Sequence, residues 1–323
     1  MLGELKIFSG RAHPALTEEI CEYLNVAAGR IEAYNFSDGE IFCQVEENVR
    51  GSDVFVVQPT CQPVNDTLVE LLIMLDTFKR SSASRVTAVI PYYGYARQDK
   101  KDQPRVPITS KLVADLISRA GADRVLTMDL HAAQIQGFFD VPVDHMFAAP
   151  VVLEAIRDLG VPDLMIVSPD AGGVERARAI AKRLNAGLAI VDKRRVSPNE
   201  AEVLHVIGDV KGREVLILDD IIDTAGTLIK TVEALKAQGC GRAYAAGVHG
   251  VLSGPALDRL EKSEVEQVLV TNTTPLDEKL DRCSKLKPLS VAPLLGEAIR
   301  DHAPAIHGLE VFPGLVLRLC PYR

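Results

Sequence analysis

The chain has 323 residues, which is enough for two domains that each bury a core of their own. With 47% hydrophobic and 25% charged residues it has the composition of a globular protein, and no apolar run approaches the roughly 18 residues of a membrane span. The formal net charge of −8 argues against binding to genomic nucleic acid, and six dispersed cysteines without a CxxC pair favour a reducing cytoplasm.

Short apolar runs rich in β-branched residues alternate with longer amphipathic runs along the first half of the chain. The pattern predicts strands at 53–59, 85–93 and 124–131, and helices at 66–80 and 109–121. Strand–helix alternation of this kind is typical of a parallel sheet that helices cover on both faces.

The second half of the chain repeats this alternation. It contains predicted strands at 163–170, 187–193, 214–220 and 242–250, and predicted helices at 173–185 and 227–239. Because both halves carry the pattern, we expect an α/β protein with two similar domains, each a mainly parallel sheet flanked by helices.

The segment "DVPVDHMFAAP" (140–150) is the best domain boundary, because it holds two prolines and breaks the periodicity. We therefore expect an N-terminal α/β domain over 1–147 and a C-terminal domain over 148–299. Residues 300–323 are a candidate to complete the first domain.

Four predicted strand ends carry polar clusters. These are Asp129 with His131, Asp170, Lys193, and Asp219 with Asp220. Ligands of open α/β sheets bind at the carboxyl ends of the strands, although a single polar residue there is ordinary. Four clusters together favour a ligand site.

The segment "DDIIDTAGTL" (219–228) combines an acidic pair with a small-residue turn between a strand and a helix. The turn consists of Asp223, Thr224, Ala225, Gly226 and Thr227. Backbone N–H groups at a helix start bind phosphate, and Gly226 allows a close approach and an unusual backbone conformation. The acidic pair is suited to sugar hydroxyls or to a metal ion. A sugar phosphate satisfies both demands, whereas helix capping accounts for one acidic residue but hardly for three.

The same segment resembles the phosphoribosyl-diphosphate-binding loop of phosphoribosyltransferases and of ribose-phosphate diphosphokinase. Further motifs favour the second family: "NFSDGE" (35–40), "PYYGYARQDKKD" (91–102), "MDLHAAQIQGFFDVPVD" (128–144), "SPDAGG" (168–173), "VDKRR" (191–195) and "HGVLSGPA" (249–256). They run in the family's order from about residue 5 to about residue 300, and a simple transferase would lack the first three. The resemblance implies a phosphoribosyltransferase-like fold.

The resemblance also implies a site for ATP and its metal. The residues at ATP would be Phe36, Asp38, Gly39, Glu40, Arg97 and Gln98, with His131 and Asp170 at the metal–ATP site and Mg²⁺ as the cofactor. Taken alone, an aromatic residue such as Phe36 is more often a packing residue, a basic loop is usually solvated surface, and a lone His is more often structural. Mg²⁺ moreover prefers oxygen ligands to imidazole.

For the second substrate, the resemblance implies a ribose 5-phosphate site and a catalytic loop. Ribose 5-phosphate would be held by Arg195, Asp219, Asp220 and the turn Asp223 to Thr227, and Lys193 and Arg195 would be catalytic. The expected reaction is Mg²⁺-dependent transfer of diphosphate from ATP to the anomeric hydroxyl of ribose 5-phosphate. It gives 5-phosphoribosyl 1-diphosphate and AMP for nucleotide, His and Trp biosynthesis in the cytoplasm, and the family implies a homo-oligomer, a hexamer.

Two other classes stay open. The resemblance makes the loop that carries Arg97 and Gln98 a flap over ATP. A non-catalytic regulatory relative would carry losses at this flap or at the catalytic loop, and a phosphoribosyltransferase would release diphosphate without ATP. The tail "HAPAIHGLEVFPGLVLRLCPYR" (302–323) lacks the Ser-rich ending of the family, which leaves regulation by phosphate and ADP open.

Overall fold

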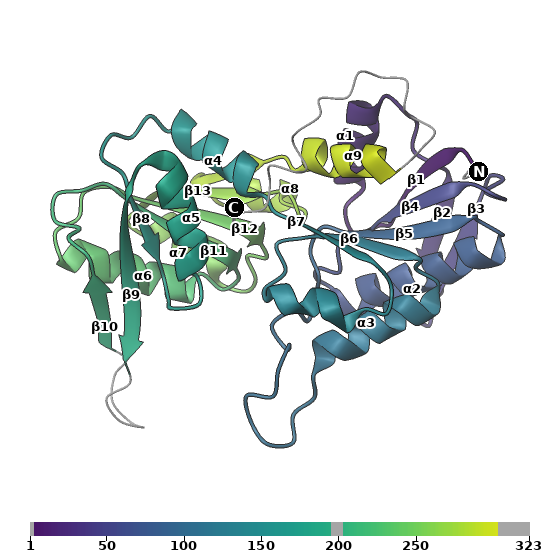
Figure 1. The fold of residues 1–323 in the computed structure, drawn as a ribbon, viewed down its shortest axis with the longest axis horizontal. Helices are drawn as coiled ribbons and strands as arrows, with labels where there is room; N and C mark the ends of the chain where they lie inside the picture. The colour runs from purple at the N-terminus through teal and green to yellow at the C-terminus, as the bar shows by residue number, and fades with distance from the viewer. Residues whose placement is uncertain (1–2, 195–202, 303–323) are drawn as a thin grey trace. The chain divides into compact units, whose positions relative to one another are not determined.

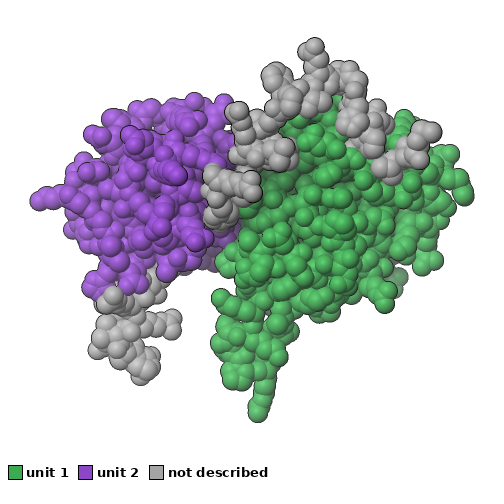
Figure 2. All heavy atoms as spheres, viewed as in Figure 1, with its two compact units in different colours: residues 1–147, 273–275, 290–319 green, residues 148–272, 276–289, 320–323 purple. Residues whose placement is uncertain are grey.

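The computed structural model describes residues 3–194 and 203–302, which form two compact units (Figure 2). Unit 1 comprises the described residues up to Phe147, residues 273–275 and the described residues from Ser290 onward. Unit 2 comprises the described residues of 148–272 and 276–289. The division into functional domains at 147 and 299 stays a prediction, and residues 290–299 group with unit 1.

Unit 1 is built on a parallel five-stranded sheet with the order β1-β4-β5-β6-β7. The strands are β1 (Leu5–Ser9), β4 (Asp53–Val57), β5 (Arg85–Ile90), β6 (Arg124–Met128) and β7 (Val143–Met146). Every residue of β4 is buried, as expected for a central parallel strand that is covered on both faces.

Helices cover both faces of this sheet (Figure 1). The helices are α1 (Pro14–Leu24), α2 (Val64–Arg80), α3 (Thr109–Ala120), the 3-10 helix η1 (Ala133–Phe138) and α9 (Ala292–His302). The helices α2 and α3 pack together on one face, and α1 and α9 pack together on the other. A separate antiparallel hairpin, β2 (Ile31–Asn35) with β3 (Ile41–Val45), packs against α2.

Unit 2 contains a seven-stranded sheet with the order β10-β9-β8-β11-β12-β13-β14. The strands are β8 (Met165–Ser168), β9 (Gly187–Arg194), β10 (Val203–Ile207), β11 (Val215–Ile222), β12 (Ala243–Gly250), β13 (Val265–Thr271) and β14 (Leu286–Leu289). All pairings are parallel except the one between β9 and β10.

The helices of unit 2 also lie on both faces of its sheet (Figure 1). They are α4 (Ala149–Asp158), α5 (Val174–Leu184), α6 (Gly226–Ala237), α7 (Ala256–Lys262) and the short α8 (Asp277–Leu280). The helix α4 packs beside α5, and α7 packs beside α6. The core between α6, α7 and the sheet includes Ile217, Leu228, Val232, Leu235 and Leu260.

These observations confirm the predicted fold class, since each unit is a mainly parallel sheet flanked by helices. All the predicted strands and helices are present, with ends that differ by up to three residues. Within the described part of the chain, none of the helices is long and apolar enough to span a membrane.

The neighbouring strands β8 and β11 form the topological switch point of the unit 2 sheet. From β8 the chain continues to β9 on one side, and from β11 it continues to β12 on the other. Ligands of open α/β sheets bind outside the carboxyl ends of the strands at such a point. The sheet order therefore directs attention to the residues that end β8 and β11.

Candidate active site

Three carboxylates lie at the switch point of unit 2. Asp219 and Asp220 are in β11, which continues to Ile222 instead of ending at the predicted residue 220, because Ile221 and Ile222 still pair with β12. Asp170 lies two residues beyond the end of β8. Because β8 and β11 are parallel neighbours, the fold brings these three predicted site residues to one edge of the sheet.

The carboxylates at this edge repel one another. Burial, together with the hydrogen bond and charge of Asp220, raises the pKa of Asp219 to about 7, and the charge of Asp170 adds to this. The Asp220 backbone N–H donates to Asp219 Oδ1 at 2.9 Å, and Arg176 Nη1 lies 3.6 Å from Asp220 Oδ1. A further cation at this edge would relieve the repulsion.

The donor chemistry of this cluster fits Mg²⁺, which prefers carboxylate oxygens and usually takes one or two of them, with water and substrate phosphate as the other ligands. No group of three or more His, Cys, Asp or Glu residues that would enclose a metal ion by itself is found among the described residues. Asp170, Asp219 and Asp220 therefore suit a cation that is shared with a substrate.

Asp170 is held by the turn that leads into α5. The Ser168 hydroxyl donates to the Asp170 backbone carbonyl at 2.7 Å, and the Gly173 N–H donates to Asp170 Oδ1 at 3.0 Å. A Cβ at Gly173 would lie 2.9 Å from Ser168 Oγ, closer than real Cβ contacts allow. The absence of a side chain at Gly173 thus lets the turn close around Asp170.

The predicted phosphate turn connects β11 to α6, which begins at Gly226, one residue before the predicted start. Ala225 precedes the helix in the left-handed conformation, with φ 58° and ψ 5°, and no described side chain forms a cap hydrogen bond there. The first N–H groups of a helix lack intrahelical acceptors, so this start is suited to an anion. Thr224 and Thr227 are exposed beside it.

The expectation for Gly226 is wrong in one respect. Gly226 has no positive φ, and the unusual backbone conformation belongs to Ala225 instead. The reason is tertiary, because the following chain segment holds the turn. Ser253 donates its hydroxyl hydrogen to Asp223 Oδ1 and its N–H to the Asp223 carbonyl, the latter at 3.1 Å.

The predicted catalytic residues lie at the end of the neighbouring strand. Lys193 is in β9 and pairs with Leu204 of β10. Since β9 runs parallel to β8, its carboxyl end lies at the same edge of the sheet as Asp170. Arg195 lies outside the described residues, as does the tail from residue 303 onward.

In unit 1, the predicted adenine-stacking residue lies on the β2–β3 hairpin. Phe36 is 46% exposed, and its ring meets those of Tyr34 and Phe42 edge-on, with centroids 5.4 and 5.9 Å away. The Phe36 N–H donates to the Glu40 carbonyl at 2.8 Å, and Gly39 closes the turn with φ 96°. Asp38, Gly39 and Glu40 are all exposed, which leaves the hairpin tip open to a ligand.

Arg97 and Gln98 follow β5 in the loop that leads to α3, and both are exposed. The Thr109 hydroxyl donates to Gln98 Oε1 at 2.6 Å, and the Ser110 N–H donates to the Gln98 carbonyl at 3.2 Å. Gln98 thereby ties the beginning of the predicted flap to the first turn of α3.

His131 lies just beyond β6 and is exposed, whereas Asp129 is 6% exposed. The intervening Leu130 N–H donates to His145 Nε2 at 2.9 Å. Burial lowers the pKa of His145 to about 4, so its ring is neutral and Nε2 is able to accept this hydrogen bond. His131 belongs to unit 1 and Asp170 to unit 2.

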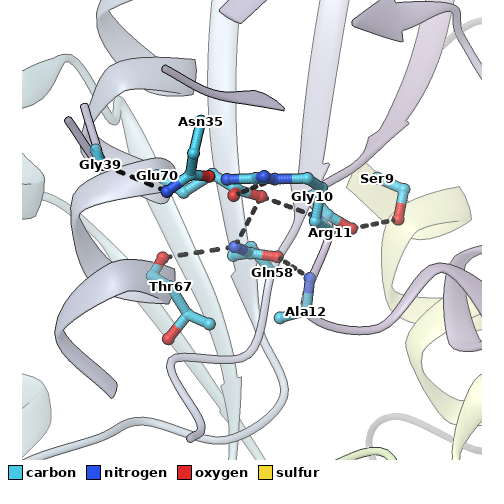
Figure 3. A network of polar contacts seen from close by, with 9 residues as sticks. All are labelled: Ser9, Gly10, Arg11, Ala12, Asn35, Gly39, Gln58, Thr67 and Glu70. Carbon is cyan, nitrogen blue, oxygen red and sulfur yellow. Dashed lines mark hydrogen bonds and ion pairs between the residues drawn. The ribbon is translucent and has the colours of Figure 1, made fainter. Parts of the chain in front are cut away.

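A polar network at the carboxyl ends of β1 and β4 in unit 1 was not predicted from the sequence (Figure 3). Gln58 is fully buried, accepts the Ala12 N–H at 3.1 Å, and donates to Glu70 Oε1 at 3.1 Å. Arg11 donates its Nε hydrogen to Glu70 Oε2 at 2.6 Å. Two signals point to this network in the sequence, namely Glu70 within the apolar run "LVELLIML" and Gln58 directly after a buried strand.

Comparison with protein families finds two matches along the chain. Residues 5–121 match the N-terminal domain of ribose phosphate pyrophosphokinase, and residues 193–309 match the phosphoribosyl synthetase-associated domain.

Relatives match nearly the whole length of the chain. The ribose-phosphate pyrophosphokinase of Caldanaerobacter subterraneus subsp. tengcongensis is 55% identical over 91% of this chain and 93% of its own length. That of Wolinella succinogenes is 54% identical over 95% of this chain and 99% of its own length. The crystal structure of phosphoribosylpyrophosphate synthetase from Mycobacterium smegmatis gives a TM-score of 0.88 at 45% identity, covering 93% of this chain and 99% of that one. The chain thus belongs to the ribose-phosphate pyrophosphokinase family.

Proposed function

We propose that this chain transfers diphosphate from ATP to the anomeric hydroxyl of ribose 5-phosphate, giving 5-phosphoribosyl 1-diphosphate and AMP. The observation that carries the proposal is the pairing, at the switch point of unit 2, of the Asp219–Asp220 pair with the anion-binding start of α6. Membership of the ribose-phosphate pyrophosphokinase family supports the same reaction.

The two parts of this cluster suit opposite ends of ribose 5-phosphate. The 5-phosphate would bind at the turn from Asp223 to Thr227, where the first N–H groups of α6 and the exposed Thr224 and Thr227 side chains gather. The ribose hydroxyls would face Asp219 and Asp220. This orientation keeps the negative phosphate away from the acidic pair and leaves the anomeric oxygen as the nucleophile.

In the reaction, a bond forms between the anomeric oxygen and the β-phosphorus while the bond from that phosphorus to the α-phosphate oxygen breaks. Such transfers need alignment and charge stabilisation more than covalent participation of the protein. Lys193 and Arg195 are proposed to balance the charge on the transferred group, and Arg195 also to contact ribose 5-phosphate. The position of Lys193 at the end of β9, next to β8, supports this role.

The ATP-binding residues proposed in unit 1 are Phe36, Asp38, Gly39, Glu40, Arg97 and Gln98. Their exposure on the hairpin tip and at the beginning of the flap supports this assignment. Asp170, Asp219 and Asp220 are the described residues best suited to hold Mg²⁺, and His131 is proposed to act at the metal–ATP site. When bound, Mg²⁺ offsets the negative charge of the phosphate oxygens.

We further propose that the protein is a cytoplasmic homo-oligomer, a hexamer, with no nucleic-acid partner. Three exposed apolar side chains lie four residues apart, one just before α3 and two on it. They are Ile108, Leu112 and Leu116, and Leu112 is 55% exposed. A row of this kind is suited to burial against another copy of the chain. Light scattering coupled to size-exclusion chromatography measures the number of copies.

An assay of AMP formation from ATP and ribose 5-phosphate, with and without Mg²⁺, tests the proposed reaction. We expect AMP and 5-phosphoribosyl 1-diphosphate in equal amounts, and a loss of about 10²–10³-fold in rate for Lys193→Ala. Absence of AMP would contradict the proposal. Diphosphate release that depends on a nucleobase and needs no ATP would instead indicate a phosphoribosyltransferase.

A further inference from the structure

The phosphate turn of unit 2 is held by one segment that follows it in the chain. Three successive backbone carbonyls, that of the last residue of β11 and those of the first two residues of the turn, accept hydrogen bonds from this segment. The Ile222 carbonyl accepts the Leu252 N–H at 3.0 Å, and the Asp223 carbonyl accepts the Ser253 N–H at 3.1 Å. The Thr224 carbonyl accepts a hydrogen bond from Arg259 Nη1 of α7 at 2.9 Å.

The Arg259 bond differs from the other two because it acts on the peptide that joins Thr224 to Ala225. In a trans peptide the carbonyl and the N–H point in opposite directions. Turning the Thr224 carbonyl toward the Arg259 guanidinium therefore turns the Ala225 N–H away from α7. Ala225 is also the residue with φ 58°, a conformation that residues with a Cβ rarely adopt unless the surrounding structure holds them there.

The guanidinium lies close to the first residue of α6 as well. A Cβ at Gly226 would lie 3.4 Å from Arg259 Nη1. Arg259 thus approaches the turn from the side of α7 and spans the point where the left-handed residue meets the helix. The segment that carries Ser253 is itself fixed, since Lys279 Nζ donates to the Gly250 and Val251 carbonyls at 3.1 and 3.0 Å.

We propose that Arg259 is a positioning residue for the binding of ribose 5-phosphate. Its guanidinium donates to the Thr224 carbonyl, and it thereby fixes the peptide plane that presents the Ala225 N–H to the 5-phosphate. This inference rests on the proposed function, which places the 5-phosphate at the start of α6. It predicts that loss of the Arg259 donor weakens ribose 5-phosphate binding and leaves ATP binding unchanged.

Steady-state kinetics of three variants test the proposal. Arg259→Met keeps most of the apolar stem and removes the donor, and Arg259→Lys restores a cationic donor. Lys262→Met is the matched control, because Lys262 lies on α7 as Arg259 does, and both side chains line a groove between α6 and α7. For Arg259→Met we expect the KM for ribose 5-phosphate to rise by about 10-fold or more, the loss typical of one charge-assisted hydrogen bond. The KM for ATP should stay within about 2-fold of the wild-type value.

The other variants separate positioning from a general effect on folding or charge. On a logarithmic scale, Arg259→Lys should reverse at least half of the rise in the KM for ribose 5-phosphate. Lys262→Met should have the same KM as the wild type. Equal increases in both KM values, or a wild-type KM for ribose 5-phosphate in Arg259→Met, would overturn the proposal.

Hydrogen exchange of the backbone amides of residues 222–228 gives a readout that does not depend on activity. In the protein without substrate, Arg259→Met should exchange these amides faster than the wild type, and Lys262→Met should not. Unchanged exchange would overturn the positioning role. If the wild type made no AMP, the proposed function would fail, while this measurement would still decide whether Arg259 orders the turn.

Discussion

Arg11 and Glu70 form a bidentate contact in unit 1, with Arg11 Nε 2.6 Å from Glu70 Oε2 and the Arg11 backbone N–H 2.6 Å from Glu70 Oε1. The Glu70 side chain is 4% exposed, whereas that of Arg11 is 40% exposed. A charged carboxylate on the buried face of α2 is thus neutralised from the solvent side by the loop that follows β1. Since a buried charge without its partner is strongly destabilising, the contact fixes this loop against the helix.

Replacement of Arg11 by Met should lower the free energy of unfolding by about 2–3 kcal/mol, because Glu70 then keeps only its neutral donors. Urea denaturation measures the loss. The matched control is Arg80→Met, which breaks the ion pair between Arg80 and Asp76. These two side chains are 78% and 49% exposed, respectively, so their loss of contact should change the free energy of unfolding little. Adding Glu70→Gln to Arg11→Met should recover part of the loss. If Arg11→Met and Arg80→Met lowered the free energy of unfolding equally, the burial of Glu70 would not be the cause of the loss.

The carboxylates at the switch point make stability depend on pH. The pKa of Asp219 is raised from 3.8 to about 7, chiefly by burial and then by Asp220. The folded state therefore binds this proton more tightly than the unfolded state does. This contribution to stability is fully present below about pH 4 and is lost as the pH rises to about 7.

Without added cation, the wild type should lose stability relative to Asp219→Asn between about pH 4 and pH 7, as measured by urea denaturation. Mg²⁺ should stabilise the wild type more than the variant at pH 8, because the cation relieves the repulsion that the substitution has already removed. A difference between the two proteins that stays constant with pH would contradict the raised pKa of Asp219.

The fold could be predicted from local sequence, because buried parallel strands and amphipathic helices carry their patterns within a few residues. Asp170 and Asp219 were likewise predicted as site residues from the apolar runs that they follow, and the fold brings them together at one edge of the sheet, although β11 continues beyond Asp219. The conformation at Ala225 could not be predicted, since local preference favours a glycine in that conformation. It is set by hydrogen bonds from residues about 30 positions later in the chain, and local patterns carry no information about such partners. The β2–β3 hairpin was not predicted either, and each of its strands is only five residues long.

The turn around Asp170 depends on the lack of a side chain at Gly173. Its φ is −84°, so alanine is tolerated by the backbone, and the only conflict is the 2.9 Å approach of a Cβ to Ser168 Oγ. Gly173→Ala should therefore cost about 1–2 kcal/mol, as overpacking typically does, and should weaken Mg²⁺-dependent activity by displacing Asp170. Thermal denaturation and the rate of AMP formation measure the two effects.

A double-variant cycle identifies the cause of that loss. Ser168→Ala removes the conflicting hydroxyl, so Gly173→Ala should cost less in a Ser168→Ala background than in the wild type. The coupling would be absent if the alanine acted through the backbone of α5 instead. Gly160→Ala is not a suitable control, because Gly160 has φ 61°, whereas Gly137→Ala meets open space without positive φ.

The carboxyl end of α9 is attached to the unit 1 sheet through Asp144. His302 Nε2 lies 3.2 Å from Asp144 Oδ2, Arg124 Nη1 donates to the same oxygen at 2.6 Å, and Arg85 Nη2 donates to the His302 carbonyl at 2.6 Å. Burial disfavours the charged form of Asp144, but the hydrogen bonds from His302 and Arg124 outweigh it and lower the pKa of Asp144 below 3.8. The carboxylate thus stabilises the folded state above about pH 4, and this stabilisation is lost as the pH falls through the lowered pKa.

Asp144→Asn should accordingly destabilise the protein at pH 7, and the difference from the wild type should shrink as the pH falls below about 4. Urea denaturation across this range measures it. Asp301→Asn is a useful control, because Asp301 is exposed on the same helix one residue before His302. If Asp144→Asn and Asp301→Asn had the same small effect at pH 7, the contact between Asp144 and His302 would not hold α9 in place. A difference that persisted undiminished at pH 3 would show instead that the loss comes from packing and not from the charge of Asp144.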